Sequence, residues 1–158
     1  MLKQILLFSQ LFLVMAALAG EKQTPSMKKL KAAELDNDML AAADPVKGKE
    51  LAVICTACHA VNRNEQTTIQ KNSKGNTGQL VHVGPPLYGI YETPIAVQKG
   101  YLYSAALKKH KGKTWTVDEL DKWLKSPTSY APGTLMTFAG LLDPQDRYDV
   151  IAYIISLK

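Results

Sequence analysis

The chain has 158 residues, of which 46% are hydrophobic and 21% charged, values typical of one globular domain rather than of a disordered protein. Its two cysteines exclude a disulfide-dense scaffold and a self-contained four-cysteine zinc or iron–sulfur site. The formal net charge of +5 suits an acidic partner, but the lysines are scattered and do not indicate nucleic-acid binding.

Residues 1–19 have the pattern of a secretory signal peptide. Lys3 supplies a positive charge, residues 5–18 are almost wholly apolar, and the Ala-Leu-Ala sequence at 17–19 fits signal-peptidase cleavage. An uncleaved membrane anchor is the alternative, but the apolar run of about 14 residues is shorter than the roughly 20 needed to span a bilayer. We therefore expect cleavage after Ala19, export to the periplasm and no membrane span in the mature chain.

Residues 20–43 form a polar stretch with some helical propensity and no strong apolar stripe, which we interpret as a loosely ordered linker or N-terminal extension. The domain is expected over residues 44–158. Its first helix begins at Asp44-Pro45, because Asp is a favoured N-cap and Pro a favoured first residue, and it extends to Cys55. Gly48 within this helix suggests a close crossing with another helix.

The rest of the domain contains loops and three further helical segments, and nothing indicates a strand. Polar residues 62–80 predict a loop. A short helix is expected near residues 104–109. Thr116-x-x-Glu119 has the pattern of a capping box and begins a helix that ends before Pro127. The last helix begins at Asp143-Pro144 and carries an apolar stripe. An all-α chain with so much loop lacks a large core of its own, so a large apolar prosthetic group would complete it.

Residues 55–59, Cys-Thr-Ala-Cys-His, carry the strongest chemical signal, because C-x-x-C-H is the attachment sequence for c-type haem. The two thiols lie on one side of a helical turn and reach neighbouring vinyl groups of one porphyrin, while His59 projects over the iron. A redox dithiol lacks its usual preceding strand, and a structural disulfide leaves His59 unexplained. A zinc site using His82 or His110 needs closer ligand spacing.

The second iron ligand must come from a distant part of the chain, and Met136 is the candidate. It follows the turn Pro132-Gly133, which suits a loop that holds one side chain at a fixed point. A thioether favours ferrous iron and raises the reduction potential. His82 and His110 are the rival ligands, and a methionine in an apolar stretch can also be core filler.

Over residues 44–158 the sequence resembles a class I c-type cytochrome. The shared sequences occur in the family's order and are Cys55-x-x-Cys58-His59, Gly84-Pro85, Gly100–Tyr103, Thr114-Trp115, Pro132–Gly140 and Asp149–Tyr153. The resemblance implies the cytochrome c fold, with three to five helices around one covalently attached haem c and its iron. It also implies that the first and last helices cross.

The resemblance implies a role for each residue of the haem site. Cys55 and Cys58 form the thioether bonds, and His59 and Met136 are the iron ligands. The Pro85 carbonyl accepts a hydrogen bond from the His59 ring and fixes its tautomer.

Tyr103 and Trp115 match the aromatic pair that hydrogen-bonds a haem propionate in this family. The sequence also departs from the family pattern. Residues 62–80 form an insertion, Glu92-Thr93 stand where many members have an arginine, and Trp123 replaces a common tyrosine near the methionine ligand.

The implied function is that of a soluble, monomeric periplasmic electron carrier rather than an enzyme. Docking to acidic surfaces of redox partners would be steered by Lys108, Lys109, Lys111, Lys122 and Lys125, or these lysines serve solubility alone. One alternative is a haem subunit dedicated to a periplasmic dehydrogenase or reductase, with residues 20–43 and 62–80 as docking elements. Others are a haem enzyme or gas-binding protein with an open iron position, and a haem-free thiol oxidoreductase.

Overall fold

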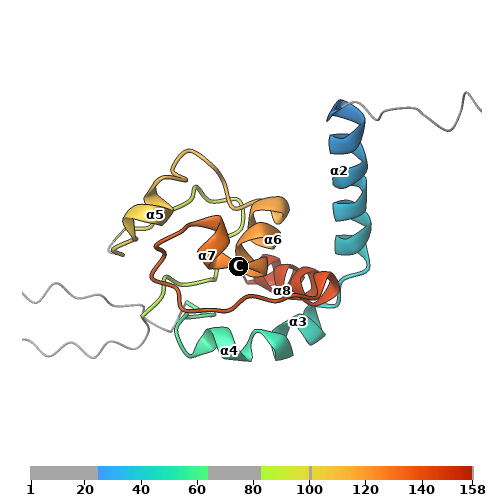
Figure 1. Cartoon of the computed structure of the whole chain (residues 1–158). Helices are drawn as coiled ribbons and strands as arrows, with labels where there is room; N and C mark the ends of the chain where they lie inside the picture. The colour runs from blue at the N-terminus through green and yellow to red at the C-terminus, as the bar shows by residue number, and fades with distance from the viewer. Residues whose placement is uncertain (1–24, 64–82, 100, 158) are drawn as a thin grey trace, which may run out of the picture. The chain divides into compact units, whose positions relative to one another are not determined.

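The computed structural model describes residues 25–63, 83–99 and 101–157 (Figure 1). The predicted signal peptide, residues 64–80 of the predicted loop and His82 lie outside these residues. The described part is helical, and its β-structure amounts to two isolated bridges. Its helices are α2 (Pro25–Ala41), α3 (Pro45–Leu51), α4 (Val53–Thr56), α5 (Ala105–Lys108), α6 (Val117–Lys125), α7 (Pro127–Tyr130) and α8 (Pro144–Ser156). The predicted all-α fold class is therefore confirmed.

The chain divides into two compact units, Met1–Leu35 and Asp36–Lys158. Helix α2 begins in the first unit and ends in the second, so the prediction of a loosely ordered segment was wrong for residues 25–41. Its Lys, Ala, Leu, Glu and Met residues favour helix even without an apolar stripe. Within the second unit, Leu40 packs against the core and Asp36 accepts a hydrogen bond of 2.5 Å from the Tyr148 hydroxyl.

Helices α3 and α8 cross closely and form the most extensive helix–helix contact of the described chain (Figure 1). Gly48 is the buried residue of α3 at this crossing, and a Cβ atom there would lie 1.9 Å from the Asp149 carbonyl oxygen. Only glycine permits this approach, as the sequence analysis suggested.

The α3–α8 crossing is also joined by charges. Asp149 is 2% exposed, and its carboxylate accepts from the Asp44 backbone N–H at 2.9 Å and the Gln145 amide at 3.0 Å, with the Lys47 ammonium 3.0 Å away. Asp44 in turn caps α3, accepting from the backbone N–H of Val46 at 2.8 Å. The predicted N-cap Asp44 is thus present, and its backbone N–H donates to the Asp149 carboxylate of α8.

The predicted capping box of α6 forms only in part. The Thr116 hydroxyl accepts from the Glu119 backbone N–H at 3.3 Å, as expected of an N-cap. The Thr116 N–H, however, donates to the Thr114 carbonyl at 2.8 Å, and the Glu119 carboxylate binds Tyr130 and Lys113 instead. Tertiary contacts therefore override the local pattern.

Helices α6 and α8 enclose the core of the second unit. The largest buried hydrophobic side chains of the described residues are Ile95, Leu107, Trp115, Leu120, Trp123, Leu124, Tyr148, Val150, Ile151, Tyr153 and Ile154. Helix α7, which the sequence did not predict, starts at Pro127 with Ser126 as its N-cap.

Within the described residues, none of the helices is long and apolar enough to cross a membrane.

Candidate haem-binding site

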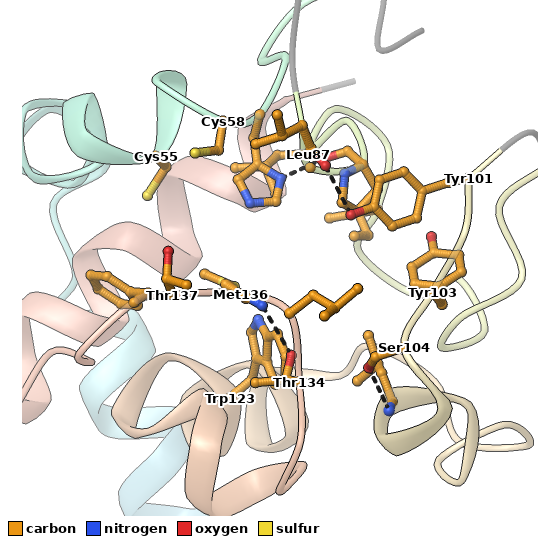
Figure 2. A pocket seen from close by; sticks show the side chains of 18 of the residues that line it. Cys55, Cys58, Leu87, Tyr101, Tyr103, Ser104, Trp123, Thr134, Met136 and Thr137 are labelled. Atoms are coloured by element: carbon orange, nitrogen blue, oxygen red, sulfur yellow. Dashed lines mark hydrogen bonds between the residues drawn. The ribbon is translucent and has the colours of Figure 1, made fainter. Parts of the chain in front are cut away.

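One cavity of about 310 Å³ collects most of the residues singled out in the sequence (Figure 2). Its walls are mainly apolar and come from segments far apart in the chain. The predicted site residues that line it are Cys55, Cys58, His59, Pro85, Tyr103, Trp115 and Met136. All seven predicted cofactor-binding residues thus face a single space.

The two cysteines occupy one wall of the cavity (Figure 2). Cys55 lies in α4, and the turn continues because the backbone N–H groups of Cys58 and His59 both donate to the Cys55 carbonyl, at 3.1 and 2.8 Å. This helical geometry places both sulfur atoms on the same side. Neither cysteine is in a disulfide, and burial raises the pKa of the Cys55 thiol, which is therefore protonated at neutral pH before haem attachment.

The His59 imidazole is fixed by two neighbours. Its Nδ1 lies 2.6 Å from the Pro85 carbonyl oxygen, and because a carbonyl only accepts, Nδ1 carries the hydrogen and Nε2 is the basic nitrogen. A Cβ atom at Gly84 would come within 2.4 Å of the imidazole, so the ring occupies the space that a side chain there would need. The ring, which is 8% exposed, thus has one defined position and one tautomer.

Met136 lies across the cavity from the two thiols (Figure 2). It is half-buried in the irregular segment 131–143 between α7 and α8. The predicted turn is present, with Gly133 at φ +92°, a backbone conformation that favours glycine. The rival ligand His110 is not among the lining residues and stacks on the Tyr130 ring at 4.3 Å between centroids, while His82 lies outside the described residues.

Aromatic side chains form another part of the wall. The Tyr101 hydroxyl donates to the Val83 carbonyl at 3.0 Å, and its ring lies 4.7 Å from that of Tyr103. Burial raises the pKa of both hydroxyls, so they remain hydrogen-bond donors. Trp123 lies beside Met136 (Figure 2), 5.7 Å from the Trp115 ring. The sequence alone indicates no role for Tyr101, although this residue belongs to the shared sequence 100–103.

The donor set fits a covalently attached haem. Two thiols can add to two vinyl groups of a porphyrin, and an imidazole and a thioether are ligands that bind its iron. Apolar walls suit the porphyrin faces, and tyrosine and tryptophan polar groups suit its propionates. The cavity and its donors therefore match the group that the sequence predicts.

The family model described as cytochrome c matches residues 45–158. The chain belongs to the cytochrome c family. As a cytochrome c, it carries a covalently attached haem c with its iron and serves electron transport. The resemblance, the fold class and the cofactor expected from the sequence are confirmed.

Relatives of this cytochrome c include bacterial cytochromes c2. That of Rhodopila globiformis is 40% identical over 116 residues, which cover 73% of this chain and 94% of the relative. That of Rhodomicrobium vannielii is 37% identical over 114 residues, covering 72% and 79% of the two chains. Among solved structures, cytochrome cH from Methylobacterium extorquens is similar with a TM-score of 0.55 and 34% identity, covering 72% of this chain and 99% of its own.

The lysines predicted to meet a partner do not line the cavity. Lys108, Lys109 and Lys111 are exposed on and just after α5, and Lys125 is exposed at the end of α6. Lys122 is paired with Asp118 at 2.5 Å, so part of its charge is neutralised locally. Three of the five predicted lysines are thus exposed on and just after α5.

Proposed function

We propose that this cytochrome c shuttles single electrons in the periplasm through a haem iron bound by His59 and Met136. The observation that carries the proposal is that both donors line one apolar cavity, in which Met136 lies across from the two cysteines of the turn that bears His59 (Figure 2). When bound, the haem supplies an iron that gains and loses one electron. With both His59 and Met136 bound to it, the iron would have no position open to a substrate, which favours a carrier over an enzyme.

The chain's own residues hold and tune the group. Cys55 and Cys58 form the thioether bonds from one helical turn. The Pro85 carbonyl keeps the hydrogen on Nδ1 of His59, so Nε2 is the atom presented to iron. The thioether of Met136 favours the ferrous state and raises the reduction potential.

Tyr103 and Trp115 bind the haem propionates in this proposal. Both line the cavity, and Trp115 is only 5% exposed, so its indole N–H benefits from a polar partner inside the site. Tyr101 closes the same wall through its hydrogen bond to Val83.

The periplasmic location rests on the signal-peptide pattern of residues 1–19 and agrees with the bacterial cytochromes c2 among the relatives. The partner is a redox protein with an acidic docking surface, because exposed lysines cluster on and after α5 and the chain carries a net charge of +5.

Replacement of the predicted thioether ligand tests the ligand pair directly. In Met136→Ala, haem stays attached through Cys55 and Cys58, but the far-red iron–thioether absorption band disappears and the reduction potential falls. His110→Ala is the matched control, since His110 does not line the cavity, and it retains the band. A Met136→Ala protein with an unchanged band would assign the ligand elsewhere.

A further inference from the structure

The segment 131–143 carries Met136 but has no regular secondary structure. Two hydrogen bonds shape it from within: the Thr134 N–H donates to the Ala131 carbonyl at 2.9 Å, and the Met136 N–H donates to the Thr134 hydroxyl at 3.3 Å. Both lie inside the segment and give it no hold on the surrounding helices. Met136 itself packs against the core, but the hydrogen bonds that hold the segment to α6 and α8 lie at its two ends.

The upstream end is held by Tyr130, the last residue of α7. Its hydroxyl donates to the carboxylate of Glu119 in α6, a side chain that is only 13% exposed. Lys113 lies 3.1 Å from the same carboxylate and 5.6 Å from the centre of the Tyr130 ring, on which His110 stacks. The ring and the hydroxyl are therefore both fixed.

The protonation states strengthen this upstream contact. Burial raises the pKa of Glu119, but the hydrogen bonds from Tyr130 and Lys113 outweigh it and hold the pKa below its ordinary value. Burial and the neighbouring carboxylate raise the pKa of the Tyr130 hydroxyl. At neutral pH the pair is thus a phenol donating to a carboxylate, which is a strong hydrogen bond.

The downstream end is held by Arg147 of α8, which is 5% exposed. Its Nη1 donates to the carbonyl oxygens of Leu141 at 3.0 Å and Leu142 at 2.8 Å, and its Nε pairs with Asp121 of α6 at 2.6 Å. The Leu141 N–H donates to the Leu124 carbonyl of α6 at 2.9 Å. One guanidinium therefore joins α6, α8 and the end of the methionine segment.

We propose that Tyr130, through Glu119, and Arg147 are positioning residues that clamp both ends of segment 131–143 and thereby hold the Met136 sulfur at the iron. The proposal rests on Met136 being the ligand, as proposed above. Anchoring both ends lowers the conformational entropy that the segment loses when its sulfur binds. Glu119 is available for this role because the Thr116 N–H, its partner in a full capping box, is bound to Thr114 instead.

The test uses the ferric haem-loaded protein and imidazole as a competing ligand, followed by loss of the far-red iron–thioether band. Tyr130→Phe keeps the ring stacking but removes the hydroxyl, so the apparent affinity for imidazole should rise roughly tenfold, the effect of losing one hydrogen bond to a charged group. Tyr148→Phe is the matched control. It removes a phenol–carboxylate hydrogen bond of the same kind, to Asp36, from a position outside the segment, and should change the affinity by less than about twofold.

Glu119→Gln and Arg147→Lys test the two clamps separately. Gln keeps an acceptor oxygen but not the charge, so the rise should be smaller than in Tyr130→Phe. In Arg147→Lys the lysine keeps a positive charge near Asp121 but lacks the planar guanidinium that bonds the Leu141 and Leu142 carbonyls. This variant should therefore also raise the imidazole affinity. If Tyr130→Phe cannot be loaded with haem, these two variants decide the question.

The outcomes separate this proposal from the proposed function. A wild-type protein without the far-red band would overturn the His59/Met136 ligation and the clamp together. A wild-type band with equal imidazole affinities in the Tyr130 and Tyr148 variants would overturn the clamp alone. A rise confined to Tyr130, Glu119 and Arg147 variants supports it, because a general loss of stability would also appear in Tyr148→Phe.

Discussion

The imidazole of His59 lies against Gly84, and only glycine, which has no side chain, leaves room for the ring. The Gly84 backbone N–H also donates to the Cys58 carbonyl at 2.7 Å, so a backbone hydrogen bond joins the two segments as well. Together with the Pro85 carbonyl, this contact determines where Nε2 points. The orientation of the proposed ligand is therefore set by backbone atoms, which single substitutions elsewhere disturb little.

Gly84→Ala should displace the proposed iron ligand. Its Cβ would come within 2.4 Å of the imidazole, and the ring must move away from Pro85 to relieve the overlap. We expect a lower yield of haem-loaded protein and an altered low-spin absorption spectrum.

Gly89→Ala is the control for this substitution, because a Cβ there meets nothing within 4 Å although φ is +65°. It should cost about 1 kcal/mol of folding stability and leave the spectrum unchanged. Identical spectra for the two variants would contradict the role assigned to Gly84.

At the scale of elements, the α3–α8 crossing depends on a buried carboxylate as well as on a glycine. Asp149 binds the N-terminal end of α3 through the Asp44 N–H, and Lys47 joins it to Asp146. Burial raises the pKa of Asp149, but its hydrogen bonds from Gln145, Asp44 and Lys47 outweigh burial and lower it below the ordinary 3.8. A buried charge with several donors stabilises the folded state only while it is ionised.

Asp149→Asn should reveal this pH dependence. Because the folded pKa is lowered, the stabilisation is complete well above pH 3.8 and is lost as pH falls through the folded pKa. Near neutral pH the variant should be less stable by about 2 kcal/mol in denaturant unfolding, and this difference should shrink as the pH falls toward about 3.

Asp146→Asn is the matched control for Asp149→Asn, since Asp146 pairs with the same lysine but is 31% exposed. It should change the stability by less than about 1 kcal/mol. A difference between wild type and Asp149→Asn that stays constant across this pH range would show that the carboxylate's charge does not matter.

At the scale of the whole molecule, the sequence predicts most clearly what depends on neighbours along the chain. The Cys55–His59 sequence, the N-caps Asp44 and Asp143 and the turn at Gly133 all have local signals, and the structure has each of them. The close helix crossing was also predictable, because Gly48 is otherwise unfavourable inside a helix.

Features that depend on distant partners were not predictable. Glu119 fits a capping box by its spacing, but Tyr130 and Lys113 compete for its carboxylate only once the chain has folded. Arg147 has an ordinary surface position in a helix pattern, yet its guanidinium is buried between backbone carbonyls and Asp121. Helix α2 was missed because its sequence favours helix without marking a buried face.

The charge distribution predicts how the whole molecule meets its partner. The exposed lysines on and after α5 should attract an acidic surface, so the second-order rate constant for electron transfer with an acidic redox protein should fall as ionic strength rises. Exchange of Lys108, Lys109 and Lys111 for glutamine should flatten that dependence. An uncharged small reductant, which senses no such attraction, provides the control, and a flat salt profile for the wild-type protein would reject steering.

Gly48 and Asp149 are separated by most of the domain's sequence, yet they meet at the contact that joins its first and last helices. A contact between residues so far apart in the sequence slows folding of the domain, because a long stretch of chain must first be brought together. The cysteine-bearing turn directly follows α3, so the position of that turn depends on how α3 packs against α8. Substitutions that loosen α8 are therefore expected to disturb the haem-attachment turn as well.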